Sequence, residues 1–420
     1  MILETPEEAI PYIMSGQNTT IIGPAGSRKS QLIETITSFF QNSIIKVAPT
    51  GQAALNIGGT TAHKMFGLGL TPFVQGQTDM SCFSKERRAV LASESLMMLI
   101  IDEIPMLRID VLQAIDYRMR QVRQEWDKPF GGIQVLLLGD PYQLPPVVTD
   151  RDLQLMMQHY TSQWFFDSEA YNEGNFQHLK LTKTYRQSDP EFIEHLTYLR
   201  FGDKKQQVID YFNDMCYKQP ENENILHLCS TNASVDAINK YFINQIDKKS
   251  FVFKGKAKGD FKERPVPENI ELKVGAKILM CYNDQKERFV NGSSGIITAL
   301  NKHGAKIELS NGNEVDIGPH TWYNYEAKVN RYTGKIENQI VGQYTQLGVK
   351  VGYSCSVHKS QGMTLLEGIL DFGDKPLFAE GQLYVALSRF TNLDKVSMKR
   401  PLTLRDFKTN MKLKNWYDNI

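Results

Sequence analysis

Three short segments in the first third of the chain carry residues that could handle a phosphate group. The segment from Gly23 to Ser30 reads GPAGSRKS, Asp102 and Glu103 follow an apolar run, and Gln143 lies in GDPYQLPPV. Glycines let backbone N–H groups wrap phosphates, a lysine reaches the β and γ phosphates, and a hydroxyl can ligate Mg²⁺. A carboxylate pair could hold the metal and activate water, while an amide could hydrogen-bond the γ-phosphate. The three segments together predict nucleotide hydrolysis.

The first of these segments departs from the usual phosphate-binding pattern at Arg28, where that pattern has glycine. If the backbone there needs a positive φ, the side chain costs about 1 to 2 kcal/mol of local strain, and a guanidinium could crowd the phosphates. A glycine-rich turn that binds no nucleotide is the alternative. The predicted nucleotide contacts in this loop are Gly23, Pro24, Ala25, Gly26, Ser27, Arg28, Lys29 and Ser30.

Uninterrupted apolar runs indicate the strands that must position these residues. Runs at 19–23, 44–50, 96–103 and 133–140 each end at a polar or glycine-rich cluster, as buried parallel strands do. Stretches with helical periodicity lie between them, for example 111–122, where apolar residues recur every three or four positions. This alternation predicts a doubly wound α/β sheet, whose ligands bind at the carboxyl ends of the strands.

A second series of strands and helices follows, with apolar runs at 225–232 and 366–372. Between them, short alternating strands with turn signals predict a small inserted β-barrel. The predicted division is a first α/β domain at 1–62 and 80–150, a loop or β-hairpin insert at 63–79, a second α/β domain at 151–253 and 341–420, and the barrel at 254–340.

Composition narrows the class of protein. Of the 420 residues, 41% are hydrophobic and 23% charged, the net charge is +1, and the pI is about 7.6, so any nucleic-acid surface must be local. Five scattered cysteines without a CxxC pair argue against a disulfide framework and against a zinc site. The N-terminus has no secretory pattern and no apolar run is long enough to span a membrane, so we expect a cytoplasmic location.

The ordered motifs resemble the superfamily 1B DNA helicases, and within them the PIF family, with RecD-like helicases as near relatives. The blocks that carry the resemblance are GPAGSRKS, APTGQAALNIGGTTAHKMFGL, LIIDEIPML, KPFGGIQVLLLGDPYQLPPV, LTKTYRQ, CSTNASVDAIN, VNGSSGII, SVHKSQGMTL and LYVALSRF. They span nearly the whole chain. Besides Arg28, the chain departs from the family at Pro105, where serine is usual, and it lacks a clear adenine-binding segment near the N-terminus.

The resemblance implies that the two α/β domains are RecA-like doubly wound parallel-sheet motor domains that bind ATP and Mg²⁺, and that the insert at 63–79 is a small wedge-like subdomain. Lys29, Ser30 and Asp102 would bind the nucleotide and its metal, with Ser30 and Asp102 as the metal ligands. Glu103 would activate water and Gln143 would sense the γ-phosphate. Arg186 of TYRQ and Arg389 of ALSRF would act as arginine fingers, which stabilise charge on the transferred phosphoryl group. Taken alone, each arginine could instead form a surface salt bridge.

The resemblance also implies a set of DNA contacts made mostly by small polar side chains and backbone amides, which suit phosphates and need no large net charge. Taken alone, the two histidines of the set would more often be packed or capping residues. Phe73 could stack on a base from an exposed loop, or pack against its own loop. The predicted DNA-binding residues are Pro49, Thr50, Gly51, Thr61, His63, Phe73, Asn232, His358, Ser360 and Thr364.

We therefore expect an ATP-dependent DNA helicase that moves 5′ to 3′ on single-stranded DNA. The resemblance implies forked or G-quadruplex DNA as further partners, a monomeric protein, and roles in DNA repair, recombination and telomere maintenance. One alternative is a strand-binding protein whose ATPase is impaired by Arg28. Another is an unrelated ATPase acting on a small molecule or protein, which leaves the SVHKSQG and APTGQAA blocks without an explanation.

Overall fold

The computed structural model describes residues 1–69, 71–78, 80, 83–261, 264–329 and 336–420. The chain divides into two compact units. The first consists of residues 1–185, 325–340 and 415–420, and the second of residues 186–324 and 341–414. Residues 70 and 79 of the predicted wedge, and 262–263 and 330–335 of the predicted barrel, lie outside the described residues.

The first unit is built on a seven-stranded sheet with strand order β1-β7-β2-β6-β5-β3-β4, in which every pairing is parallel. All four residues of β2 and all four of β5 are buried, as expected for strands covered on both faces. The strands are β1 (Ile2–Leu3), β2 (Thr19–Ile22), β3 (Ile44–Ala48), β4 (Thr60–Thr61), β5 (Met98–Ile101), β6 (Gln134–Gly139) and β7 (Gln177–Leu181).

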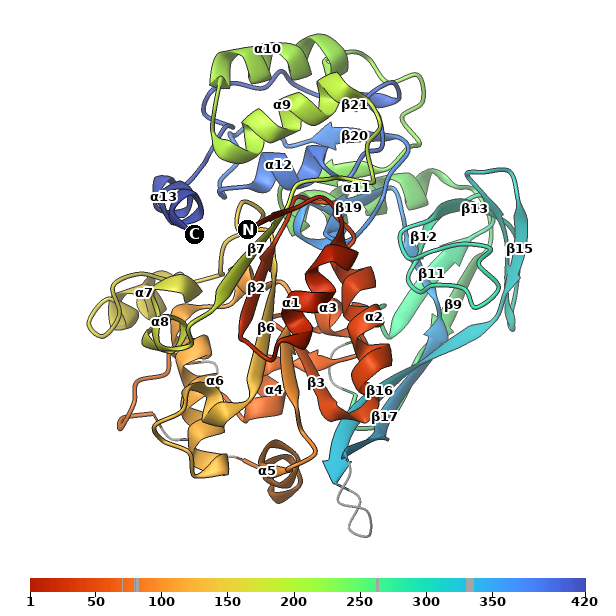
Figure 1. The fold of residues 1–420 in the computed structure, drawn as a ribbon. Helices are drawn as coiled ribbons and strands as arrows, with labels where there is room; N and C mark the ends of the chain where they lie inside the picture. Colours follow the sequence, from red (N-terminus) through yellow and green to blue (C-terminus); the bar gives the residue numbers. More distant parts are fainter. Residues whose placement is uncertain (70, 79, 81–82, 262–263, 330–335) are drawn as a thin grey trace. The chain divides into compact units, whose positions relative to one another are not determined.

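Helices α1, α2 and α3 share one hydrophobic core with the strands, so they pack on the same face of this sheet (Figure 1). Leu32, Ile33 and Ile36 of α2 are the buried positions of that helix, at helical spacing. The helices of the first unit are α1 (Ile10–Met14), α2 (Lys29–Phe40), α3 (Gly51–Asn56), α4 (Ala62–Phe66), α5 (Lys85–Ala92), α6 (Ile109–Arg123), α7 (Asp150–Met156) and α8 (Glu169–Glu173).

The boundary of the first unit differs from the prediction. Residues 151–185 were expected in the second motor domain, but β7 pairs in parallel with both β1 and β2 and therefore belongs to the first sheet. In the segment 177–181 only Leu179 and Leu181 are buried. Because this segment is not an uninterrupted apolar run, its sequence did not indicate a parallel strand near the sheet edge. In the predicted wedge, the described residues contain α4 followed by loop, without a β-hairpin.

The second unit contains a four-stranded parallel sheet in the order β19-β8-β20-β21, as the second series of apolar runs predicts. Its strands are β8 (His227–Cys229), β19 (Ser354–Ser356), β20 (Gly368–Asp371) and β21 (Val396–Met398). Its helices are α9 (Pro190–Phe201), α10 (Lys205–Cys216), α11 (Asn232–Gln245) and α12 (Gln382–Leu387), and α13 (Met411–Asn419) begins in this unit and ends in the first.

Antiparallel strands between β8 and β19 share one hydrophobic core, in the region where the sequence predicts an inserted β-barrel. They are arranged in sheets of five, three and two strands, in the orders β15-β14-β13-β12-β18, β10-β17-β16 and β11-β9. The strands are β9 (Ser250–Lys254), β10 (Lys256–Gly259), β11 (Asn269–Lys273), β12 (Lys277–Met280), β13 (Ser294–Asn301), β14 (Gly304–Leu309), β15 (Glu314–Ile317), β16 (Pro319–Val329), β17 (Ile336–Leu347) and β18 (Val349–Val351).

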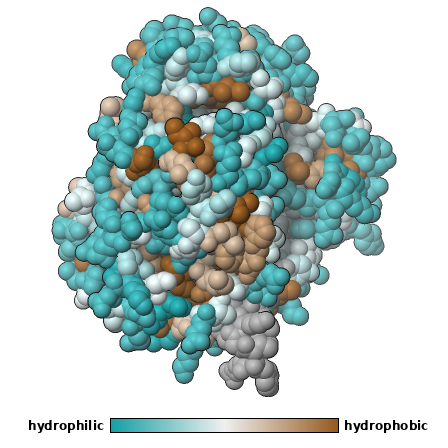
Figure 2. Space-filling view, in the orientation of Figure 1, coloured by the Kyte–Doolittle hydropathy of each residue, from teal (hydrophilic) through white to brown (hydrophobic). Residues whose placement is uncertain are grey.

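The face of the molecule in Figure 2 is mixed rather than extensively apolar. Hydrophilic residues cover most of the face in Figure 2, and apolar residues appear there in small groups. Across the described ranges, no helix combines the length and the apolar character needed to cross a membrane.

Candidate nucleotide and DNA sites

The phosphate-binding candidate is the turn between β2 and α2. Gly26 has φ +81° and the turn is tight, since a Cβ on Gly23 would lie 2.7 Å from the Ser27 Oγ atom. The Lys29 ammonium donates hydrogen bonds to the carbonyls of Gly23 and Pro24, at 2.8 and 3.1 Å, and to Ser27 Oγ at 3.1 Å. Ser30, in the first turn of α2, is exposed. The turn therefore has the glycine conformation, the lysine and the hydroxyl that a phosphate-binding loop requires.

Arg28 adopts the left-handed conformation that its place in the loop pattern suggests, with φ 61° and ψ 29°. Its guanidinium carbon lies 3.9 Å from the centroid of the Tyr185 ring. A cation–π contact at an exposed position contributes about 0.5 to 1 kcal/mol, which offsets part of the backbone strain of about 1 to 2 kcal/mol. The Arg28 side chain is thus engaged by Tyr185, a residue that the sequence analysis did not single out.

Asp102 and Glu103 follow β5 at the carboxyl edge of the first sheet. Burial raises the pKa of Asp102, and the Glu103 backbone N–H and the positive charge of Lys29 partly oppose that rise. The positive charge of Lys29 therefore acts on the Asp102 carboxylate and lowers its pKa. Glu103 has φ 49°, a strained value for a residue with a side chain, of the kind that clusters at functional sites.

Pro105, the other departure from the family pattern, packs beside β6. A Cβ placed on Gly139 would clash with the Pro105 ring, so glycine at the end of β6 makes room for this proline. The proline is buried in the short helical turn that follows Glu103. The substitution is accommodated by local packing and leaves both carboxylates at the sheet edge.

Gln143 lies in the loop that follows β6, the strand between β2 and β5 in the sheet. Its side chain is 7% exposed, and its Nε2 atom donates to Asp140 Oδ2 at 3.4 Å. Tyr142, next to it, packs edge-on against Tyr417, with ring centroids 5.5 Å apart. Because β2, β6 and β5 are neighbours, the loop carrying Lys29, the Asp102–Glu103 pair and Gln143 meet at one edge of the first sheet.

A magnesium nucleotide fits these residues. Mg²⁺ bound together with phosphates needs only one or two carboxylates, because phosphate oxygens and water complete its shell. Asp102 and Ser30 supply one carboxylate and one hydroxyl. In the part of the chain that the structure describes, no cluster of three or more His, Cys, Asp and Glu residues is placed to hold a metal ion.

The two predicted arginine fingers lie together in the second unit, around Ser388. Arg186 donates to the Ser388 carbonyl at 2.9 Å and to Thr364 Oγ1 at 3.1 Å, while Arg389, which is 2% exposed, donates to Ser388 Oγ at 2.9 Å. Burial, together with the positive charge of Arg389, lowers the pKa of Arg186 to about 9. A bound anion would relieve this repulsion, which is consistent with a role toward phosphate.

Four of the predicted DNA contacts in the first unit lie at the ends of the neighbouring strands β3 and β4. Thr50 and Thr61 cap α3 and α4, accepting hydrogen bonds from Ala53 N and Lys64 N. The other two contacts of this group, Pro49 and Gly51, flank the Thr50 cap.

His63 and Phe73 lie in and after α4. Burial lowers the pKa of His63, and Arg108 lowers it further while Asp110 opposes the change. Phe73 is only 4% exposed. Its ring centroid lies 5.7 Å from that of Tyr117, and its backbone N–H donates a hydrogen bond to Asp110 Oδ2. The expectation of an exposed, base-stacking Phe73 is therefore wrong for this structure, because the loop packs the ring against α6.

The predicted DNA contacts in the second unit differ in accessibility. Asn232 is exposed at the first turn of α11, and Thr364 is exposed while accepting a hydrogen bond from Arg186. His358 stacks on Phe378, with centroids 6.2 Å apart, and burial lowers its pKa. Ser360 is fully buried and donates to the Val357 carbonyl, so its side chain supports the loop rather than offering an atom to DNA.

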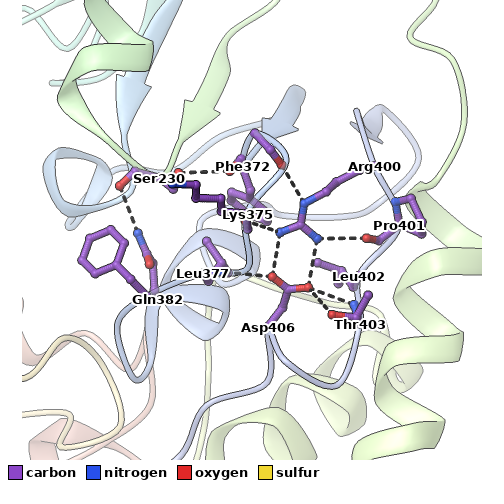
Figure 3. A network of polar contacts seen from close by, with 12 residues as sticks. Ser230, Phe372, Lys375, Leu377, Gln382, Arg400, Pro401, Leu402, Thr403 and Asp406 are labelled. Carbon is purple, nitrogen blue, oxygen red and sulfur yellow. Dashed lines mark hydrogen bonds and ion pairs between the residues drawn. The ribbon is translucent and has the colours of Figure 1, made fainter.

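A polar network holds the turn that carries Asn232 (Figure 3). Ser230 Oγ donates to the Phe372 carbonyl at 3.1 Å, and Gln382 Nε2 donates to the Ser230 carbonyl at 3.2 Å. Arg400 lies nearby in the same view, paired with Asp406 through two hydrogen bonds of 2.7 and 2.9 Å. Sequence reasoning missed this network because its members are spread from β8 to the segment before α13.

Sequence reasoning also missed other residues at the candidate sites. Tyr185, Ser388 and Tyr142 each stand next to a predicted residue in the chain, at Arg186, Arg389 and Gln143. That adjacency was the available signal. What each side chain contacts, however, depends on packing between segments distant in sequence.

Known proteins of one family are similar to this chain over most of its length. Residues 7–210 match the model of the PIF1-like helicase family. The chain is 29% identical over 413 residues to the ATP-dependent DNA helicase Pif1 of Campylobacter jejuni, covering 92% of this chain and 89% of that protein.

Two solved structures of Pif1 from Bacteroides are similar over almost the whole chain. One, in complex with ADP-AlF4, is 29% identical with a TM-score of 0.90 and covers 99% of this chain and 96% of that one. The other, bound to single-stranded DNA, is 30% identical with a TM-score of 0.72 and covers 100% of this chain and 97% of that one. Because the single-stranded-DNA-bound Pif1 is 30% identical to this chain over nearly its whole length, and the family model matches residues 7–210, the protein belongs to the PIF1-like helicase family.

Proposed function

We propose that the protein is an ATP-dependent DNA helicase that moves 5′ to 3′ on single-stranded DNA and unwinds duplex or structured DNA. The observation that carries this proposal is the Lys29 ammonium, held inside the turn after β2 and close enough to the buried Asp102 to act on its pKa. The motor would run on ATP hydrolysis between two RecA-like units. A related structure, 29% identical to this chain, concerns DNA unwinding at forked double-stranded DNA by two coordinating Pif1 helicases, which supports a fork as one substrate here.

Each residue of the nucleotide set has a role in this proposal. Lys29 binds the β and γ phosphates, and Ser30 and Asp102 hold Mg²⁺. Bound Mg²⁺ supplies neutralisation of charge on the phosphates. Glu103 orients and deprotonates the attacking water, and Gln143 hydrogen-bonds the γ-phosphate.

Arg186 and Arg389 stabilise charge on the transferred group, an effect that reaches about 10³ to 10⁵ in rate in other phosphoryl-transfer systems. Their shared packing around Ser388 supports a joint role. Arginines of the second unit acting on a nucleotide held by the first would make the approach of the two units depend on ATP, and this dependence would drive movement along the strand.

The alternative function is a strand-binding protein whose ATPase is impaired by Arg28. The contact between Arg28 and Tyr185 favours the active motor. The guanidinium lies over the Tyr185 ring, while the Gly23 and Pro24 carbonyls accept hydrogen bonds from Lys29. We also propose that the protein is monomeric and cytoplasmic and that it acts on G-quadruplex DNA. Roles in repair, recombination and telomere maintenance are part of the same proposal.

The first test is steady-state ATP hydrolysis by the purified chain, with and without single-stranded DNA, beside Arg28→Gly. Strong stimulation of the unaltered chain by DNA supports the motor. Silence in the unaltered chain with recovery in Arg28→Gly would support the strand-binding alternative instead.

Direction of movement needs a separate test, with fluorescent forked duplexes carrying either a 5′ or a 3′ single-stranded tail. The proposal requires unwinding of the substrate with the 5′ tail, in the presence of ATP and Mg²⁺. Unwinding of only the substrate with the 3′ tail would contradict the direction but not the helicase activity.

A further inference from the structure

Arg28 takes part in one of the contacts that join the candidate phosphate-binding turn to Thr184 and Tyr185, at the end of the 1–185 stretch of the first unit. Its guanidinium lies over the Tyr185 ring at 3.9 Å. The Tyr185 backbone N–H donates to the Gly26 carbonyl at 2.9 Å, and Thr184 Oγ1 donates to the Ala25 carbonyl at 3.1 Å. Two consecutive residues after β7 are therefore docked on three residues of the turn.

The backbone conformation of Arg28 belongs to this contact. The residue is the N-cap of α2, yet its side chain makes no capping hydrogen bond. A strained left-handed residue persists where its surroundings over-determine it. Glycine would adopt the same φ with less strain, but it has no side chain to contact the Tyr185 ring. Arginine at this position therefore has a more strained backbone and gains a side-chain contact.

We infer that Arg28 is a positioning residue, which docks Tyr185 on the phosphate-binding turn and so ties that turn to Arg186, the next residue in the chain and the first of the second unit. The inference rests on the proposed ATPase function. A change in the turn backbone on phosphate binding would then displace Tyr185 and the start of the segment that carries Arg186. Arg28 acts through Tyr185 and has no chemical step of its own.

The chain offers a matched control at Lys183. Its Nζ atom lies 5.3 Å from the centroid of the same ring, farther than the Arg28 guanidinium, and the residue is exposed. Lys183→Ala removes a cation from the same ring without touching the turn. Arg28→Asn removes the guanidinium but keeps a residue that tolerates positive φ, so it separates the loss of the contact from a change in backbone strain.

The first measurement uses the protein without nucleotide, by hydrogen exchange of the Tyr185 amide in peptides covering 182–186. We expect Arg28→Asn and Arg28→Gly to raise its exchange rate about fivefold, the size that loss of a cation–π contact implies. Lys183→Ala and Tyr185→Phe, which keep the closer contact, should change it less than about twofold. Unaltered exchange in both Arg28 variants would overturn the inference.

The second measurement separates kcat from KM in DNA-stimulated ATP hydrolysis. We expect kcat to fall about threefold to tenfold in Arg28→Asn and Arg28→Gly, while KM for ATP changes less than about twofold, because positioning acts after binding. In a Tyr185→Leu background, the Arg28 substitutions should have no further effect. A rise in kcat in Arg28→Gly, or an undiminished effect in that background, would refute the positioning role.

The pattern of results separates failure of this inference from failure of the proposed function. No ATP hydrolysis by the unaltered chain, with or without DNA, would contradict the proposed function and with it any positioning role in hydrolysis. The exchange measurement would still decide whether Arg28 holds Tyr185. Normal hydrolysis with no response of exchange or kcat to Arg28 would contradict the inference alone.

Discussion

The two units contain strand-to-helix turns at similar places in their parallel sheets, but the turns are held in different ways. In the first unit, the turn after β2 is shaped by positive φ at Gly26 and Arg28, and Lys29 donates to its carbonyls. In the second unit, the turn after β8 is held by side chains: Thr231 Oγ1 accepts from Ser234 N, and Ser230 is hydrogen-bonded on both sides.

This difference explains why one turn suits a phosphate and the other does not. Binding an anion with backbone N–H groups requires them to converge, and a residue with positive φ produces that convergence. In the second turn, the Thr231 side chain accepts a hydrogen bond from the Ser234 backbone N–H. This N–H is therefore already used in the N-cap of α11. Under the proposed function, the same architectural unit would bind phosphate in one place and would support a DNA contact in the other.

The largest effect should come from Lys29→Ala in the first turn. Loss of the ammonium should lower the rate of ATP hydrolysis about 10³-fold, because it removes a charge that stabilises the phosphates. Steady-state hydrolysis with single-stranded DNA measures the change, and Lys258→Ala, on an exposed strand of the insert, is the matched control. Retention of full turnover in Lys29→Ala would contradict the assignment of this turn to the nucleotide.

The second unit should respond instead through stability, most strongly at Asp406→Asn. Asp406 is 1% exposed, pairs with Arg400 and accepts from the backbone N–H groups of Leu377 and Thr403. Leaving Arg400 without its charge partner should lower the free energy of unfolding by about 3 kcal/mol. Urea denaturation followed by circular dichroism measures this, and an unchanged midpoint would show that the network does not support the fold.

The same pair predicts an acid-sensitive contribution to stability. Burial tends to raise the pKa of Asp406, but the hydrogen bonds from Arg400, Leu377 and Thr403 outweigh it and lower the pKa to about 2. A lowered pKa stabilises the folded chain above the unfolded value of about 3.9, and this contribution is lost as the pH falls toward about 2. Comparing unfolding at pH 5 and pH 3 should show a steeper loss in the unaltered chain than in Asp406→Asn; parallel losses would contradict the role of Asp406.

Thr231→Ala should give a smaller effect, a loss of about 1 kcal/mol in unfolding free energy, because it removes the cap of α11. Thr231→Ser keeps the hydroxyl and is the control. Nucleotide affinity, measured by titration with a fluorescent ATP analogue, should stay the same in both variants. A marked loss of nucleotide affinity in Thr231→Ala would remove the distinction between the two turns.

The smallest effect should be that of Asn232→Ala on DNA affinity. One neutral hydrogen bond to a phosphate is worth about 0.5 to 1.5 kcal/mol, so the affinity for single-stranded DNA should fall about twofold to tenfold. Fluorescence anisotropy with a labelled oligonucleotide measures it, with Asn244→Ala at the far end of α11 as the control. Equal affinities of the two variants would contradict a DNA contact at Asn232.

Tertiary contacts decided several features that local patterns could not indicate. Phe73 is buried because Asp110 of α6 binds its backbone and Tyr117 packs against its ring. Residues 151–185 belong to the first unit because β7 pairs with β1 and β2. Arg28 meets Tyr185 only because the segment after β7 returns to the turn after β2. Each depends on segments far apart in the chain.

By itself, the sequence determined the main buried strands of both parallel sheets and the glycine-rich turn between β2 and α2. It also determined the position of Asp102 and Glu103 at a strand end, because hydrophobic periodicity, glycine placement and motif spacing are local properties. Only the tertiary structure decided which of the predicted side chains are exposed and which partners they contact. Burial and pairing arise from how distant segments pack, and no short stretch of sequence contains that information.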